Sequence, residues 1–148
     1  MVSTAATFST RSLTQAPALA GPVVLLGRVF FALIFLMAGL NHFSSQTISY
    51  AASQGVPLAS IAVPFSGVLA LFGGLSILLG YRAKLGAWLI ALFLVGVTPM
   101  MHKFWTVPDP MMHQMQMVMF MKNLAMLGGA LLISQFGSGP WSLDSRRK

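Results

Sequence analysis

Four apolar stretches, each long enough to cross a lipid bilayer, occupy most of this chain and restrict its choice of fold. They cover residues 22–43, 57–80, 85–101 and 112–136. A helix needs about 20 predominantly apolar residues to span the hydrocarbon core, within a usual range of about 17 to 25. The sequence therefore predicts an all-α integral membrane protein, a four-helix transmembrane bundle with short connections between antiparallel neighbours. Residues 22–136 form this transmembrane domain.

The composition agrees with a membrane protein and excludes several kinds of site. The chain is 56% hydrophobic and 7% charged, whereas about a quarter of the residues in soluble domains are charged. It contains no cysteine, which excludes disulfides, thiolate metal sites and cysteine nucleophiles. The net charge of +7 comes from basic residues scattered between apolar spans. No nucleic acid is expected as a partner, because these residues do not alternate with aromatic side chains on a soluble face.

The basic residues are divided unevenly between the two sides of the membrane. If the chain crosses the membrane four times, one group of basic residues lies on the same side: Arg11, Arg28, Arg82, Lys84, Arg146, Arg147 and Lys148. The other side has Lys103 as its basic residue outside the membrane. By the positive-inside rule, both termini are cytoplasmic. Residues 1–21 are then a flexible cytoplasmic tail and residues 137–148 a basic one, and a short interfacial helix is expected at residues 48–53.

Lys122 and Asn123 lie near the middle of the fourth span, where a charge is costly. Insertion scales place that cost at roughly 3 kcal/mol. The two acidic residues of the chain, Asp109 and Asp144, lie in predicted loops and cannot pair with Lys122 inside the membrane. Lys122 and Asn123 are therefore candidate contacts for a quinone or lipid, with Arg28 as a weaker third. The alternatives are a structural role that orients helices or holds another chain and, for Arg28, snorkelling to the near interface.

Histidine and methionine gather at the end of the bundle predicted to be periplasmic. His42 ends the first span, His102 ends the third, and His113 begins the fourth. Met112 and Met115 lie close to His113 on the fourth span. Imidazole and thioether groups are ligands for soft or borderline metals, copper especially. The alternative is that the histidines sit at the membrane interface and that methionine fills irregular apolar gaps.

A catalytic constellation is absent from the sequence. It contains no Gly-rich phosphate loop, no nucleophile beside a base and no pair of carboxylates in the spans. The sequence therefore predicts no intrinsic catalytic activity.

Several motifs, in their order and spacing, resemble the DoxX family of small four-helix bacterial membrane proteins. They lie at residues 25–43, 55–57, 67–74 and 78–82, and at residues 120–144 around a Lys-Asn-Leu-Ala segment that begins at Lys122. The resemblance covers roughly residues 22–144. It implies a multi-pass protein of the bacterial cytoplasmic membrane, linked to redox or stress-related complexes.

One position departs from the family pattern. Many members carry a glutamate inside the second span, and the aligned residue here is Ala70. The missing carboxylate weakens the case for proton or redox chemistry within this chain, and it strengthens the case for a structural role or for a partner that supplies the group.

The leading hypothesis is a DoxX-like accessory subunit of a larger membrane complex, redox- or quinone-linked, that holds lipid or quinone. Its expected partners are other membrane protein subunits and lipid. The alternative is a self-sufficient membrane oxidoreductase component, or a copper-binding protein that uses the His/Met-rich periplasmic end. A small transporter is disfavoured, because no internal repeat and no matched pair of broken helices is visible in the sequence.

Overall fold

The computed structural model describes residues 19–146, and all regular structure within that range is helical. The elements are α1 (Ala20–Asn41), α2 (Ser45–Ser53), α3 (Ala59–Leu79), α4 (Ala83–Met101), the single 3-10 turn η1 (Phe104–Thr106) and α5 (Pro110–Phe136). Four helices are long and apolar enough to cross a membrane, which confirms the predicted all-α membrane bundle. Their ends lie within two residues of the expected spans. Arg11, Arg147, Lys148 and most of the expected N-terminal tail lie outside the described residues.

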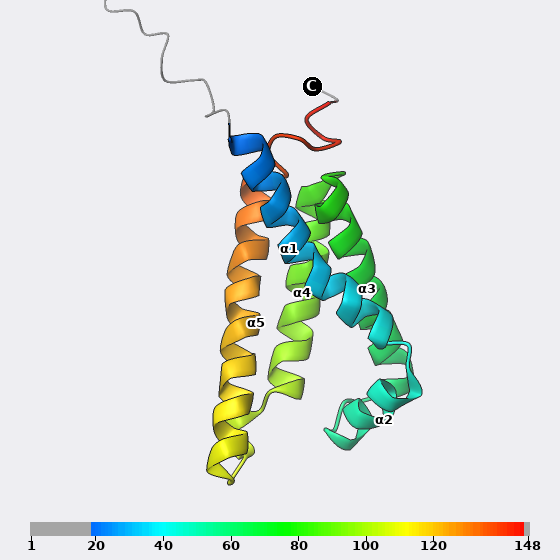
Figure 1. The fold of residues 1–148 in the computed structure, drawn as a ribbon. Helices are drawn as coiled ribbons and strands as arrows, with labels where there is room; N and C mark the ends of the chain where they lie inside the picture. The colour runs from blue at the N-terminus through cyan, green and yellow to red at the C-terminus, as the bar shows by residue number, and fades with distance from the viewer. Residues whose placement is uncertain (1–18, 147–148) are drawn as a thin grey trace, which may run out of the picture.

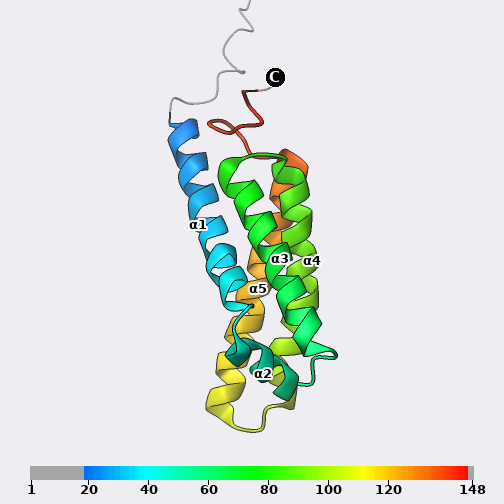
Figure 2. The same cartoon turned by 90° about the vertical axis from the view of Figure 1, so that its right-hand side faces the viewer.

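The four long helices pack in a consecutive order, with α1 against α3, α3 against α4, and α4 against α5. Helix α1 crosses the bundle obliquely and diverges from α5 away from the chain ends (Figure 1). The short helix α2 lies across the opposite end and packs against α3 (Figure 2). The start of α1 and the last described residues lie at one end of the molecule (Figure 1), as four spans require. The positive-inside rule makes this the cytoplasmic end.

Glycines let the backbones of α1, α3 and α4 approach closely. A Cβ atom on Gly73 of α3 would lie 2.9 Å from the carbonyl oxygen of Gly86 on α4 and 2.8 Å from the side chain of Ile90. A Cβ atom on Gly67 would lie 3.0 Å from the carbonyl oxygen of Gly39 on α1. In lipid, close packing of this kind is a main source of helix association, because burial of apolar groups adds little.

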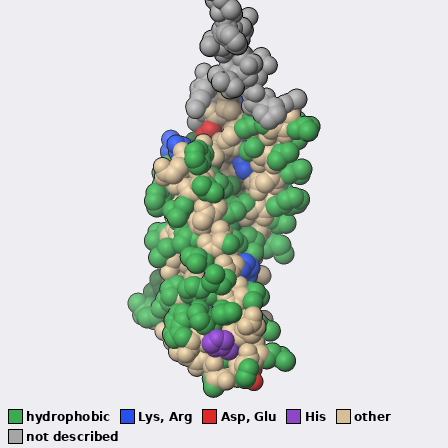
Figure 3. Space-filling model, turned by 90° about the vertical axis from the view of Figure 1, so that its left-hand side faces the viewer, with side chains coloured by type: hydrophobic (Ala, Val, Ile, Leu, Met, Phe, Trp, Pro, Cys, Tyr) green, Lys and Arg blue, Asp and Glu red, His purple; other side chains and the backbone are tan. Residues whose placement is uncertain are grey.

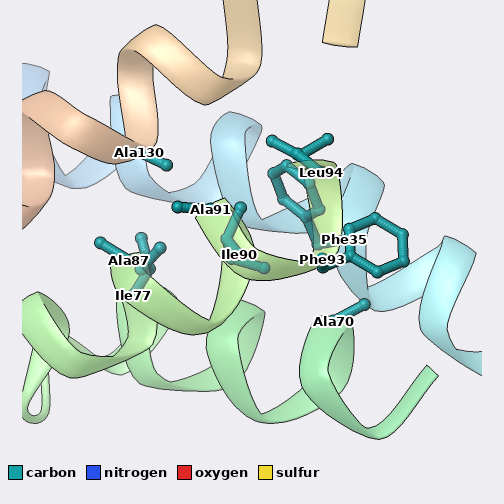
Figure 4. Close-up of a cluster of buried hydrophobic side chains, with 9 residues drawn as sticks. All are labelled: Phe35, Ala70, Ile77, Ala87, Ile90, Ala91, Phe93, Leu94 and Ala130. Carbon is teal, nitrogen blue, oxygen red and sulfur yellow. The ribbon is translucent and has the colours of Figure 1, made fainter. Parts of the chain in front are cut away.

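The apolar core lies between α1, α3, α4 and α5 and combines small residues with a few large ones (Figure 4). Phe35, Ile77, Ile90 and Leu94 are its largest fully buried side chains. The alanines that belong to this core are Ala70, Ala87, Ala91 and Ala130. The rings of Phe35 and Phe93 meet edge to face with centroids 6.2 Å apart, a favourable arrangement for two aromatic side chains.

Side-chain caps set the start of three helices. The Asp109 carboxylate accepts a hydrogen bond of 2.8 Å from the Met112 N–H at the start of α5, and Ser44 caps α2 by accepting one from Thr47 N–H. The interfacial helix expected at residues 48–53 is α2, which starts three residues earlier because Ser44 supplies this cap. At α4, the cap comes from Asp144, far along the chain.

Candidate ligand pocket and polar residues of the spans

A cavity of about 520 Å³ lies between α2, α3, α4 and the end of α1, near the periplasmic end. Its walls are mainly apolar, and its polar lining residues are His42, Thr47, Tyr50, Ser66 and His102. Two further lining residues, Phe65 and Leu92, are more than half exposed, so the pocket opens on the surface that faces lipid. Sites for small apolar ligands have this size and this mixture of apolar walls with a few polar groups.

Both histidines of the pocket have Nδ1 engaged by the protein. His42 Nδ1 donates to the carbonyl oxygen of Ala38 at 2.5 Å, since a carbonyl can only accept. His102 Nδ1 forms a hydrogen bond of 2.8 Å with Oε1 of Gln116 on α5. Neither Nε2 atom has a hydrogen-bond partner among the described residues. The free edge of each imidazole is therefore available to a ligand, and in neutral His42 the unpaired Nε2 is an acceptor.

The third predicted histidine belongs to a separate aromatic cluster at the start of α5. His113 packs edge-on against Phe104 of η1, with ring centroids 5.6 Å apart. Phe104 also meets Trp105 and Phe120 in the same edge-to-face manner. This cluster attaches η1 to α5 and keeps His113 outside the lining of the pocket.

The structure does not assemble His42, His102 and His113 into one metal centre. Among residues 19–146, no group of three or more His, Cys, Asp or Glu side chains could hold a metal ion. Met112 and Met115 are exposed on α5. Metal binding through these five residues stays a prediction. Its test is the copper and zinc content of the purified protein before and after replacement of His102 and His113 together.

Lys122 is exposed on α5, in the middle of the longest span. Its ammonium donates to the sulfur of Met119 at 3.3 Å, and no other hydrogen bond of this side chain is formed with residues 19–146. A thioether is a weak acceptor and leaves most of the ammonium unsatisfied. Asn123, the next residue, lies about 100° further round the helix and is only 7% exposed. Its amide makes no hydrogen bond with a described side chain or backbone group.

Arg28 lies far from Lys122, at the cytoplasmic end. Its side chain is 4% exposed and donates to the carbonyl oxygen of Trp141 through a terminal nitrogen. Nε and the second terminal nitrogen are buried without a hydrogen-bond partner. One turn further along α1, Phe31 packs against Gly129 of α5. Since Lys122 lies two turns beyond Gly129 in the periplasmic direction, it is separated from Arg28 by about 15 Å along the bundle.

Arg28 is covered by the segment that follows α5, residues 137–146, termed here the C-terminal strap. The strap returns to the turn between α3 and α4: Leu143 N–H donates to the Leu79 carbonyl, and Asp144 N–H donates to the Gly80 carbonyl at 2.8 Å. Gly80 is required there, because a Cβ atom would clash with Arg28 and Ser142, and because its φ of 63° is left-handed. The strap therefore completes a buried polar cluster around Arg28.

The sequence named three residues together as contacts for a quinone or lipid: Lys122, Asn123 and Arg28. In the structure they occupy three different environments. None of them lines the apolar pocket. The pocket instead uses His42 and His102, which the sequence marked for metal, along with residues that carry no chemical signal, such as Val56 and Val63. The position of α2 over the side of α3 creates the pocket, and no sequence motif records that position.

Residues 23–103 match the sequence model of the DoxX family. The inner membrane protein YphA of Escherichia coli is 30% identical over 130 residues, which cover 86% of this chain and 92% of YphA. The inner membrane protein YqjF of the same species is 30% identical over 123 residues, 82% of this chain and 88% of YqjF.

A more distant similarity extends to yeast. The ER-derived vesicles protein ERV29 of Saccharomyces cerevisiae is 27% identical over 88 residues, which are 57% of this chain and 27% of ERV29. No solved structure gives a significant match. The family match, the two bacterial relatives and the four apolar helices agree: the chain belongs to the DoxX family, as a multi-pass protein of the bacterial inner membrane.

Proposed function

We propose that this protein is an accessory subunit of a larger membrane complex, for which it holds a quinone or lipid molecule without performing the chemistry itself. The observation that carries the proposal is the exposure of Lys122 on the outer surface of α5, at mid-membrane depth. A second observation, the apolar pocket, supports the ligand-holding part.

Lys122 belongs to an exposed stripe along α5, termed here the α5 stripe. Its members recur at intervals of three and four residues, so they share one face of the helix: Met111, Met115, Val118, Lys122 and Ala125. No residue from 110 to 122 is buried, so the periplasmic half of α5 stands largely outside the bundle. Figure 3 shows this side of the molecule, where apolar side chains cover most of the height and a basic side chain interrupts them partway down.

An ammonium group that faces lipid at mid-membrane depth needs a partner. Ionisable residues in spans almost always face protein or a water-filled cavity and mark functional contacts. This chain has no acidic residue in its spans that could serve. A helix of another subunit with a carboxylate or amide at the same depth would satisfy Lys122, and its apolar side chains would cover the methionines of the stripe. Methionine is suited to such a surface, because its flexible side chain adapts to irregular partners.

The pocket suits a flat apolar ligand with polar substituents. A quinone ring presents two carbonyl acceptors, and a quinol presents two donors. Tyr50 can donate to the first, and the Nε2 atoms of neutral His42 and neutral His102 can accept from the second. The lateral opening beside Phe65 and Leu92 admits a ligand that arrives through the bilayer.

The subunit role is tested by photo-crosslinking in native membranes. A photoreactive amino acid is placed at Met115 or Val118 on the α5 stripe and, as a matched control, at Phe65 or Phe72, which are exposed on α3. The stripe positions are expected to crosslink to one defined membrane protein and the α3 positions to lipid. Replacement of Lys122 by Met should weaken that crosslink. Crosslinks to lipid alone from all four positions, with a monomer after mild extraction, would contradict the subunit role.

The ligand-holding role is tested by extraction of the purified protein and measurement of the quinone and lipid it retains. Val63 lines the pocket and is 5% exposed, so Val63→Phe fills part of the space. Val68→Phe adds the same atoms to the exposed face of α3. We expect the retained ligand to fall with Val63→Phe and to stay with Val68→Phe. Equal retention by both variants would contradict the ligand-holding role of the pocket. The proposed subunit contact through the α5 stripe would still stand.

A further inference from the structure

A second cavity, of about 640 Å³, lies at the opposite end of the molecule from the apolar pocket. It is bounded by the start of α4, the end of α5 and the C-terminal strap, and is termed here the cytoplasmic cleft. Its basic lining residues are Arg82 and Lys84, its apolar ones are Leu85 and Phe136, and Asp144 contributes a carboxylate. The charges and the apolar wall come from different elements that the strap brings together.

The carboxylate of Asp144 is engaged by the protein itself. One oxygen accepts from the backbone N–H of Arg82 at 2.9 Å, and the other accepts from that of Ala83 at 3.1 Å. The same carboxylate interacts electrostatically with buried Arg28. Its negative charge is thus directed to the start of α4 and to Arg28. The cleft retains two exposed side-chain cations, Arg82 and Lys84.

The two cations border an apolar surface. Leu85 is 58% exposed and Phe136 is 82% exposed, and both line the cleft. The Lys84 chain runs along the turn after α5, where its Cε lies 3.6 Å from the place a Cβ atom on Gly137 would take. The stem of the lysine therefore packs on protein backbone while its ammonium remains at the membrane surface. Positive charge directly above exposed apolar side chains complements a phosphate group joined to an acyl chain.

We infer that the cytoplasmic cleft binds an anionic phospholipid of the inner leaflet. Arg82 and Lys84 pair with the phosphate, and an acyl chain lies along Leu85 and Phe136. A soluble phosphate would use the cations alone and would leave the apolar wall in contact with the bilayer. The site lies at the other membrane interface from the apolar pocket, so it does not depend on the proposed function.

The test measures lipid binding by the full chain in nanodiscs of phosphatidylcholine that contain increasing fractions of phosphatidylglycerol. Arg82→Asn and Lys84→Gln are the variants, and Asn is chosen because it tolerates the left-handed φ of 47° at position 82. Lys103→Gln, which removes a cation at the periplasmic side, is the matched control. We expect each cleft variant to weaken phosphatidylglycerol binding about fivefold, the effect of one basic residue near an anionic surface. The control should bind like the unaltered protein.

Three results would overturn the inference. The first is unchanged phosphatidylglycerol affinity in Lys84→Gln, the variant that does not alter the left-handed position 82. This result counts whether or not the thermal stability of the variant falls. A fall in thermal stability without a change in affinity would assign Lys84 to stabilisation of the α5 terminus. The second is displacement of phosphatidylglycerol by millimolar glycerol 3-phosphate, which would make the cleft a site for a soluble phosphate. Phe136→Ser should weaken phosphatidylglycerol binding, and an unchanged affinity there would likewise exclude the acyl-chain contact.

Discussion

Asp144 caps a helix that begins 61 residues earlier in the chain: its carboxylate accepts the backbone N–H of Ala83 at the start of α4. The same residue donates its own N–H to Gly80 in the preceding turn. Asp109 caps α5 in the ordinary way, three residues before Met112, whose backbone N–H it accepts. The two caps are chemically alike, but the first also attaches the C-terminal strap to the bundle.

This difference predicts unequal effects of the same substitution. Asp109→Ala should cost about 1 kcal/mol of stability, the usual value of a lost cap. Asp144→Ala should cost more, since the strap and the counter-charge of Arg28 are lost with it. Thermal unfolding in mild detergent, followed by tryptophan fluorescence, compares the two. Equal shifts in Tm would mean that the strap contributes nothing beyond the cap.

Arg28→Met should release the strap while it leaves the bundle intact. The substitution removes the hydrogen bond to the Trp141 carbonyl and leaves Asp144 without its buried counter-charge. We expect faster hydrogen exchange in residues 141–146, measured by mass spectrometry, with little change in α3 and α4. Arg82→Met, which alters an exposed cation nearby, is the control. Uniform acceleration across all helices would show instead that Arg28 stabilises the whole fold.

Gly73→Ala should destabilise the protein, and Gly27→Ala should not. A Cβ atom at position 73 would meet Ile90 and the backbone of Gly86, so α3 and α4 must separate at a cost of about 1 to 3 kcal/mol. A Cβ atom at position 27 would meet nothing within 4 Å. There, the higher helix propensity of alanine should add up to about 1 kcal/mol. The Tm values of the pair in detergent are expected to move in opposite directions.

Lys122→Met should stabilise the isolated chain but weaken its complex with the proposed partner subunit. Loss of a charge at mid-membrane depth should stabilise the isolated protein in bicelles by about 1 to 3 kcal/mol. The same change should weaken attachment of the proposed partner subunit. Lys103→Met serves as control, because Lys103 donates to the Gln54 carbonyl at 3.1 Å, and its loss should destabilise. A destabilised Lys122→Met chain would indicate that Lys122 is satisfied within its own protomer.

His102 links α4 to α5, and the link depends on Nδ1. His102→Asn places an amide nitrogen close to that position and should retain the bond to Gln116. His102→Leu has no polar atom there and leaves Gln116 unpaired, at a cost of about 1 to 3 kcal/mol. The Tm of the Asn variant should therefore exceed that of the Leu variant. The reverse order would show that the His102 side chain stabilises by apolar packing.

The sequence was sufficient for the spans and for the side-by-side packing of the second and third spans. Each span is a long apolar run, and the turn of residues 80–82 is too short to let α3 and α4 lie anywhere but side by side. Gly73 and Gly74 are buried in helix interfaces, and small residues inside a span are typical of such contacts. These features are local or periodic, which is why they can be predicted from sequence alone.

The candidate sites could be predicted from the sequence much less well than the spans. The strap carries no apolar periodicity, so nothing in residues 137–146 indicated that Trp141 would hold Arg28 or that Asp144 would cap α4. The pocket depends on where α2 lies over α3, a tertiary relationship between uncharged segments. Lys122 drew attention correctly as an unusual residue, but its exposure could be learned only from the orientation of α5.

The cap of α4 also sets an order of events during synthesis. Ribosomes deliver α3, the turn and α4 to the membrane well before residue 144 exists, so the first N–H groups of α4 face the cytoplasm uncapped while α5 is still being made. Closure of the cytoplasmic end must therefore wait until the fourth span has been inserted. A chain that stalls before Asp144 would present an open α3–α4 turn, a feature by which a membrane protease could distinguish unfinished copies from finished ones.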